Sequence, residues 1–244
     1  MKKFTCIIAC ILIASRLLAQ DCARFIYMQT GKTIEMSTFN KKGDVEMKSL
    51  STISDVTTSG SIITAKVATQ VFDKKGNSLG TSNAKYSCNG NAVSVEMDYD
   101  AGQQTNTNMQ IDVKQDNNTV EYPTTMQVGD HLKDGTSIMD FGNGKINSEI
   151  TVKVYDRVVL AKESVTTPAG TWDCYKISYK TANSSTFKGE GADTLNKLTS
   201  AISKFALKFK KPAEPSETTI WYAPDFGLVK METKNMMMEL TAIK

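Results

Sequence analysis

The alternation of apolar and polar residues, repeated along most of the chain, constrains the fold more than any other feature. In residues 62–72, and again in 150–155, aliphatic side chains alternate with polar ones, as in a strand with one buried face. Short clusters of glycine, asparagine and aspartate separate the runs, at 75–77, 89–91, 134–135 and 142–144. Because short loops join antiparallel neighbours, the sequence predicts an all-β antiparallel meander that forms a strongly curved sheet or an open β-barrel.

Three internal matches bear on the domain organisation. Residues 39–43 (FNKKG) recur as 72–76 (FDKKG), which predicts one hairpin turn used twice. Residues 28–31 recur as 126–129, and 86–97 loosely resemble 222–231. We expect a single β-rich domain over 21–244. Two similar halves, 23–100 and 120–244, and one meander without internal symmetry remain alternatives.

One segment has the pattern of a helix rather than of a strand. Asp193 is a candidate N-cap, and Pro212 follows the predicted end. Apolar residues recur between them at helical spacing: Leu195, Leu198, Ile202, Phe205 and Phe209. The sequence therefore predicts an inserted amphipathic helix at about 193–211. Its apolar stripe is expected to pack on the sheet; the alternative is that its lysine-rich face lies on an anionic membrane.

The N-terminus has the layout of a secretory signal peptide. Lys2 and Lys3 precede an apolar run over 4–14, and small residues lead to Gln20, so residues 1–20 are predicted to be cleaved on export. The run is shorter than the roughly 20 apolar residues of a membrane-spanning helix, and no transmembrane span is expected in the mature chain. Lipid attachment at Cys10 or Cys22 is the alternative to simple cleavage.

The charge balance changes when the predicted signal peptide is removed. The full chain has 29 Lys and Arg against 26 Asp and Glu. The signal peptide contains three basic residues and no acidic residue, so the mature chain is neutral. A neutral protein has no global field that would attract nucleic acid, and no nucleic-acid partner is predicted.

Three cysteines remain after residue 20, namely Cys22, Cys88 and Cys174. They allow one disulfide and one free thiol, as an oxidising compartment permits. Cys22 and Cys88 both lie beside turn-like sequence, which favours that pair, although spacing alone leaves the connectivity open. Cys174 lies inside a strand pattern, where a free cysteine acts as a small buried hydrophobe.

The sequence contains no catalytic or cofactor motif. A Ser-His-Asp or Cys-His site would need His131, the single histidine, which we expect on a loop or strand edge. Ser78 matches the letters of a G-x-S-x-G nucleophile elbow, but its surroundings predict a hairpin instead of the required strand-to-helix turn. Asp98 and Asp100 lack the density of oxygen ligands that calcium requires. We therefore predict a protein without enzymatic activity, metal or cofactor.

Three stretches resemble the TapB-like exported proteins of Gram-negative bacteria, a family of unknown function. They are 163–177 (ESVTTPAGTWDCYKI), 221–224 (WYAP) and 227–230 (GLVK). The positions of Cys22 and of 86–88 (YSC) also fit, so the likeness covers nearly all of the mature chain. The resemblance implies an envelope β-protein in the periplasm or at the periphery of the outer membrane. It supplies no catalytic residues, and the 193–211 segment is longer than the usual connection in that family.

Two functions are compatible with these features. In the first, a concave face of the sheet binds an apolar small molecule or lipid. Its candidate lining residues are Trp172, Tyr175, Trp221 and Tyr222, which would otherwise belong to the core. In the second, the protein is an envelope interaction or assembly factor that contacts a protein partner or a membrane surface through its sheet edges or its basic helix.

Overall fold

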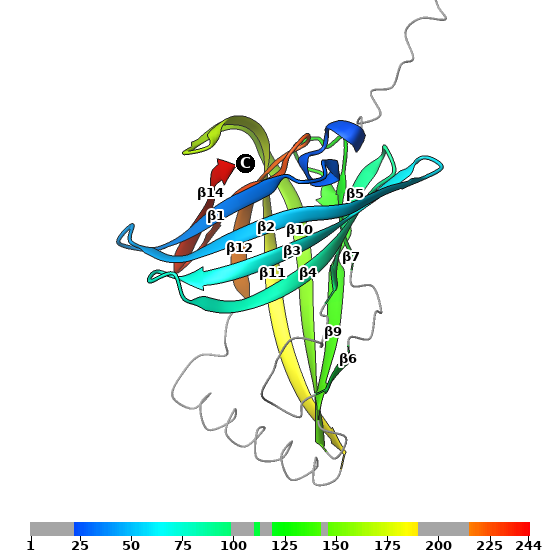
Figure 1. Ribbon diagram of the computed structural model, residues 1–244, viewed down its shortest axis with the longest axis vertical. Coiled ribbons are helices and arrows are strands. Elements are labelled where there is room, and N and C mark those ends of the chain that lie inside the picture. Colours follow the sequence, from blue (N-terminus) through cyan, green and yellow to red (C-terminus); the bar gives the residue numbers. More distant parts are fainter. Residues whose placement is uncertain (1–21, 99–109, 113–118, 143–145, 190–214) are drawn as a thin grey trace, which may run out of the picture.

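The computed structural model describes residues 22–98, 110–112, 119–142, 146–189 and 215–244 (Figure 1). Within these ranges a single antiparallel sheet of 14 strands curves strongly on itself. The predicted all-β, barrel-like meander is confirmed. The predicted signal peptide at 1–20 and the predicted helix at 193–211 lie outside the described residues. None of the described helices is long and apolar enough to cross a membrane.

Two short 3-10 turns, η2 (Cys22–Arg24) and η3 (Ile26–Met28), precede the strands. The strands are β1 (Thr33–Asn40), β2 (Val45–Ser59), β3 (Ile62–Asp73), β4 (Ser78–Cys88), β5 (Ala92–Asp98), β6 (Gln110–Asp112), β7 (Thr119–Pro123), β8 (His131–Leu132), β9 (Gly135–Gly142), β10 (Ile146–Thr167), β11 (Gly170–Gly189), β12 (Ser216–Ala223), β13 (Gly227–Thr233) and β14 (Met236–Ile243). Their order in the sheet is β6-β9-β10-β11-β12-β13-β14-β1-β2-β3-β4-β5-β7, and β8 pairs with β10 beside this path.

The repeated FNKKG and FDKKG sequences form the same hairpin turn. Asn40 Oδ1 accepts hydrogen bonds from the backbone N–H groups of Lys42, at 2.8 Å, and Asp44, at 3.1 Å. Asp73 Oδ1 accepts the corresponding bonds from Lys75 and Asn77, both at 2.8 Å. The glycine of each turn has a positive φ, 84° at Gly43 and 86° at Gly76. The prediction of one turn used twice is therefore confirmed, because both side chains bond locally to the backbone in the same way.

The longest hairpin joins β10 to β11 through the TPAG turn, where Thr167 pairs with Gly170. Below the curved part of the sheet both strands continue together with β9, which pairs with β10 from Val154 to Asn147 (Figure 1). Register shifts interrupt β10 after Tyr155 and β2 after Ser54, and each is followed by an aspartate with positive φ, Asp156 at 53° and Asp55 at 49°. Such bulges bend strands and increase their twist.

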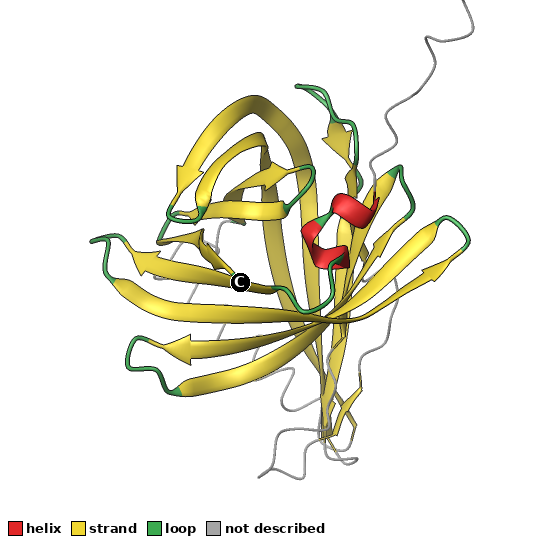
Figure 2. Ribbon diagram, turned by 45° about the horizontal axis from the view of Figure 1, so that its top comes forward, coloured by secondary structure: helices red, strands yellow, loops and turns green. Residues whose placement is uncertain are grey.

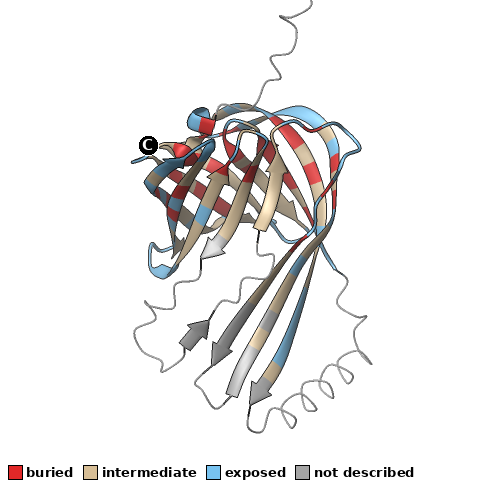
Figure 3. Cartoon of the chain, turned by 90° about the vertical axis from the view of Figure 1, so that its right-hand side faces the viewer, coloured by how far each residue is buried: buried red, intermediate tan, exposed pale blue. Residues whose placement is uncertain are grey.

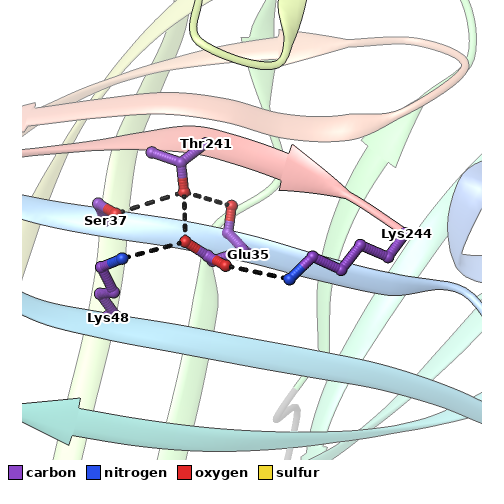
Figure 4. A network of polar contacts seen from close by, with 5 residues as sticks. All are labelled: Glu35, Ser37, Lys48, Thr241 and Lys244. Carbon is purple, nitrogen blue, oxygen red and sulfur yellow. Dashed lines mark hydrogen bonds and ion pairs between the residues drawn. The ribbon is translucent and has the colours of Figure 1, made fainter. Parts of the chain in front are cut away.

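The first and last strands of the domain lie side by side, since β1 pairs with β14. Figure 4 shows a polar network across this pair. Thr241 Oγ1 donates to the Glu35 backbone oxygen at 3.2 Å. The Glu35 carboxylate lies 3.4 Å from Lys48 Nζ and 3.7 Å from Lys244 Nζ. The network therefore connects β14 and its C-terminal lysine to β1 and β2.

The N-terminal segment 22–28 packs into one end of the curved sheet, where Figure 2 shows its two helical turns. Phe25 is fully buried. Cys22 is joined to Cys88 at the end of β4 by a disulfide, the pair that the sequence favoured. Gly227 makes room for the segment: a Cβ atom there would lie 3.2 Å from the Tyr27 ring and 3.4 Å from the Phe25 ring. Figure 3 shows that buried residues concentrate in this curved part of the molecule.

Candidate functional site

A cavity of about 310 Å³ lies inside the curved sheet, beneath the N-terminal segment. Segment 22–28, β4, β5 and β7 form one side, and β9, β10, β12 and β13 form the other. Its lining residues are mainly aliphatic and aromatic: Phe25, Tyr27, Tyr86, Val93, Val95, Val120, Tyr122, Gly135, Thr136, Ser137, Val152, Val154, Tyr222, Gly227 and Leu228. None of these described lining residues carries a charge. The volume falls at the lower end of the range typical of small-molecule sites.

Strand register explains why valines dominate two of the walls. Val95 pairs with Val120 across β5 and β7. On the opposite wall, Val152 pairs with Ser137 across β10 and β9. Directly opposed residues of antiparallel strands share a face, and residues two apart on one strand do the same. The strand alternation that was visible in the sequence therefore brings these side chains to the inner surface.

Four tyrosines form the aromatic part of the lining. Tyr27 and Tyr86 stack with ring centroids 4.3 Å apart and planes 2° from parallel. Tyr122 and Tyr222 stack at 4.4 Å and 8°. Stacked pairs add stabilisation beyond the burial of their area. The four rings come from four different elements, and their stacking fixes segment 22–28 against β4 and β7 against β12.

Burial raises the pKa of all four phenols. The pKa of Tyr27 is raised to about 12 by burial, which a hydrogen bond with Tyr86 partly opposes. The pKa values of Tyr86 and Tyr222 are raised well above the ordinary value by burial and then by the neighbouring phenols. Burial also raises the pKa of Tyr122, against the opposing influence of Arg157. The interior of the cavity therefore disfavours negative charge.

Two hydroxyl groups of the cavity wall are buried without a hydrogen-bond partner, Tyr222 OH and Ser137 Oγ. Both residues line the cavity, and the Tyr222 residue is 4% exposed. A buried polar group left without a partner costs about 1–3 kcal/mol, and such groups are rare enough in folded proteins to require an explanation. The two hydroxyls are thus the candidate polar contacts of this site.

Arg157 holds the two ends of the sheet together beside the cavity. Among the described strands, β7 and β9 are not paired in the sheet. They nevertheless lie close together, because a Cβ atom added to Gly135 would be only 3.2 Å from Val120 Cγ2. Arg157 is 1% exposed. Its guanidinium donates to the backbone oxygens of Lys133, at 2.5 Å, and Glu121, at 3.0 Å, and its Cζ lies 4.9 Å from the centroid of the Tyr122 ring. We refer to this approach of β7 to β9 as the β7/β9 seam.

The structure places only one of the four predicted lining residues, Tyr222, in the cavity. Trp221 precedes it on β12 and faces the other side of the sheet, where its Nε1 donates to Glu163 Oε1 at 2.6 Å. The ammonium groups of Lys176 and Lys230 lie 5.1 Å and 4.8 Å from the centroid of its ring. Successive strand residues point to opposite faces, so Trp221 and Tyr222 do not share one site.

The other two predicted residues lie outside the lining of this cavity. Trp172 packs on Phe226 with ring centroids 4.7 Å apart, and its Nε1 donates to Thr167 Oγ1 at 3.3 Å. Tyr175 is buried, and the Lys162 ammonium lies 5.3 Å from the centroid of its ring. Both residues therefore pack against neighbouring side chains, which is the alternative to lining a cavity that their sequence allowed.

The residues that could carry nucleophilic chemistry are separate from one another and from the cavity. His131 is exposed on β8. Ser78 begins β4 directly after the 73–77 turn, without the helix that a nucleophile elbow needs. Cys174 is fully buried, and burial, followed by Asp173 and Glu163, raises the pKa of its thiol to about 12. Among the described residues no group of three His, Cys, Asp or Glu could hold a metal ion.

Sequence reasoning missed Tyr27, Tyr86, Tyr122 and Arg157. The three tyrosines are separated by more than 30 residues and converge only through tertiary structure. Arg157 did give a local signal, because it stands two positions before Val159 in a strand pattern. An arginine on the face of a buried aliphatic residue is rare unless its donors are satisfied.

Comparison with known proteins gave one family and two solved structures. The model of the DUF3108-like family matches residues 29–243. A crystal structure of a predicted exported protein with a YmcC-like fold from Bacteroides fragilis superposes with a TM-score of 0.60 at 19% identity, covering 88% of this chain and 96% of that one. A predicted lipoprotein from Parabacteroides distasonis gives a TM-score of 0.63 at 19% identity, covering 92% and 100%. At this identity the likeness concerns the fold. The search of curated proteins gave no significant match.

Proposed function

Because this chain belongs to the DUF3108-like family, a family of unknown function, we propose a role from its site: it is an exported, non-enzymatic envelope protein that binds an apolar or lipid-like molecule in the cavity. The observation that carries this proposal is a cavity of about 310 Å³ inside the curved sheet whose lining residues carry no charge. Interiors are normally packed with few voids larger than a water molecule. A space of this size amounts to roughly ten water-sized groups.

The location in the envelope is part of the same proposal. The N-terminal layout of residues 1–20 and the disulfide between Cys22 and Cys88 support export to an oxidising compartment. The descriptions of the two structural neighbours as a predicted exported protein and a predicted lipoprotein agree with it. We also propose that the protein is related to the TapB-like proteins and that it lies in the periplasm or at the periphery of the outer membrane.

The alternative role as an interaction or assembly factor has less support. Its simplest signature would be one continuous apolar patch on the surface. The large exposed apolar side chains are Ile62, Leu79, Val128, Leu160 and Met236. They are spread over four strands and one loop of the described structure. Their positions therefore do not indicate a single docking surface.

The proposal is tested by blocking the cavity. Val152 lines it from β10, and Val152→Phe would extend a larger side chain into the space. Val128→Phe makes the same change at a position that is 62% exposed and serves as the matched control. Binding of the neutral fluorophore N-phenyl-1-naphthylamine is measured for the wild-type chain and for both variants, and native mass spectrometry of protein purified from envelopes detects molecules that co-purify.

We expect the wild-type chain and Val128→Phe to bind the fluorophore with similar affinity. We expect Val152→Phe to bind at least tenfold more weakly while its thermal unfolding remains cooperative. If no molecule co-purifies and the wild-type chain does not bind the fluorophore, the proposed function is wrong. Equal binding by Val152→Phe would place the ligand elsewhere on the protein and would also contradict the proposal.

A further inference from the structure

The cavity lining contains two hydroxyl groups without a hydrogen-bond partner in a mainly apolar surface. Ser137 Oγ belongs to β9, and Tyr222 OH belongs to β12. The rest of the lining is mainly aliphatic side chains and aromatic rings. A molecule in this space would place its apolar part against the valines and could give the two hydroxyls the hydrogen-bond partners that they lack.

The charge of such a molecule is limited by its surroundings. None of the described side chains that line the cavity is charged. Arg157 is the buried cation beside it, and its guanidinium already donates to the carbonyl oxygens of Lys133 and Glu121. The raised pKa values of Tyr86 and Tyr222 show that the same space opposes the formation of an anion. An ion placed there would lose its hydration without gaining a partner of opposite charge.

We infer that the cavity selects an uncharged amphipathic molecule whose polar group hydrogen-bonds the hydroxyls of Tyr222 and Ser137. This inference rests on the proposed function, because it specifies the chemical class of the ligand for the same site. An alcohol, ketone, ester or amide meets the requirement. A carboxylate or an ammonium does not, and a plain hydrocarbon would leave both hydroxyls unpartnered.

Three probes of closely similar size separate these classes. Naphthalene has no polar group, 1-naphthol has one neutral hydroxyl, and 1-naphthoate is an anion at pH 7.4. The affinity of each probe is measured by fluorescence titration with the wild-type chain and with Tyr222→Phe and Ser137→Ala. Tyr175→Phe and Ser94→Ala are the matched controls, because each removes the same kind of hydroxyl at a residue that does not line the cavity.

In the wild-type chain we expect 1-naphthol to bind about five- to tenfold more tightly than naphthalene, the ratio that one net hydrogen bond gives. We expect 1-naphthoate to bind at least tenfold more weakly than 1-naphthol. Tyr222→Phe or Ser137→Ala should remove the advantage of 1-naphthol and leave the affinity for naphthalene within twofold of the wild-type value. Both control variants should retain that advantage.

Several outcomes would overturn the inference. Equal affinity for naphthalene and 1-naphthol in the wild-type chain would mean that water satisfies the hydroxyls. Equal affinity for 1-naphthol and 1-naphthoate would mean that the site accepts an anion. An advantage of 1-naphthol that survives in both site variants would mean that other groups bind it. In each case naphthalene still binds, so the proposed function would stand; failure of naphthalene to bind the wild-type chain would count against both proposals.

Discussion

At the scale of single residues, Arg157 is a buried cation beside the cavity. It is almost fully buried, and no carboxylate lies within ion-pair distance among the described residues. Two backbone oxygens, of Lys133 and Glu121, take the place of an acidic partner. Hydrogen bonds from a charged donor contribute more than neutral ones, and here the bond to Glu121 connects β10 to β7, which no strand pairing joins.

Arg157→Met should lower the free energy of unfolding by about 2–4 kcal/mol, because it removes a buried charged donor from the carbonyl oxygens of Lys133 and Glu121 and its contact with the Tyr122 ring. The measurement is urea denaturation followed by circular dichroism. Arg24→Met is the matched control, because Arg24 is exposed, and it should change stability by no more than about 0.5 kcal/mol. Equal stability of the two variants would show that the β7/β9 seam does not depend on Arg157.

At the scale of elements, the short N-terminal segment depends on the covalent link to β4 for its position. It supplies Phe25 and Tyr27 to the cavity, and its two turns contain only three residues each. Helical segments this short are not stable alone. The disulfide between Cys22 and Cys88, 66 positions apart, therefore ties the segment to β4, and it also stabilises the fold by limiting the conformations of the unfolded chain.

Reduction of this disulfide, or the double change Cys22→Ser with Cys88→Ser, should lower the free energy of unfolding by about 2–4 kcal/mol. It should also weaken binding of N-phenyl-1-naphthylamine, since the segment covers the cavity. Urea denaturation and fluorescence titration measure the two effects. Cys174→Ala is the comparison, because that cysteine is free and its replacement should leave the response to reductant unchanged. A reduced protein with wild-type stability and binding would contradict the assignment.

The local elements were predictable and their assembly was not. The turns at 40–44 and 73–77 follow from a few neighbouring residues, and the alternation at 150–155 places Val152 and Val154 on one face of a strand. The contact between β7 and β9 and the convergence of Tyr27, Tyr86 and Tyr122 depend on residues far apart in the chain. Trp221 and Tyr222 were both named as candidate lining residues, although neighbouring strand residues point to opposite faces, and of the two only Tyr222 lines the cavity. The prediction of two similar halves remains a prediction.

At the scale of the whole molecule, the buried tyrosines and the buried Cys174 together make the stability of the fold depend on alkaline pH. Burial raises the pKa of Tyr27, Tyr179 and Cys174 to about 12, and it raises those of Tyr86, Tyr122 and Tyr222. The unfolded chain ionises the same groups near pH 9–10. Below that pH both states hold these protons, so the folded state keeps its full stability. Above it the unfolded state alone releases them, and stability falls as the pH rises.

We therefore expect the protein to lose stability steeply between about pH 10 and pH 12. Tyrosinate absorbance near 295 nm should rise in two stages, the first from exposed tyrosines and the second together with loss of the β-sheet circular dichroism signal. The variant Tyr86→Phe should shift the second stage to higher pH. A single gradual rise in absorbance, completed while the sheet remains folded, would show that the phenols of the cavity are accessible to solvent.

The pairing of β1 with β14 also determines when the fold can be completed. Thr33 and Lys244 exchange two backbone hydrogen bonds, each 2.9 Å long, so one of the two partners of β1 lies about 200 residues further along the chain. A chain that emerges from the ribosome or through a membrane pore with its N-terminus first leaves that edge of β1 unpaired until β14 arrives, about 200 residues later. Contacts of such sequence separation slow folding, and an unpaired strand edge is a site of aggregation. The protein should therefore depend on a holding chaperone during its synthesis or passage more than a sheet of the same size built only from neighbouring hairpins.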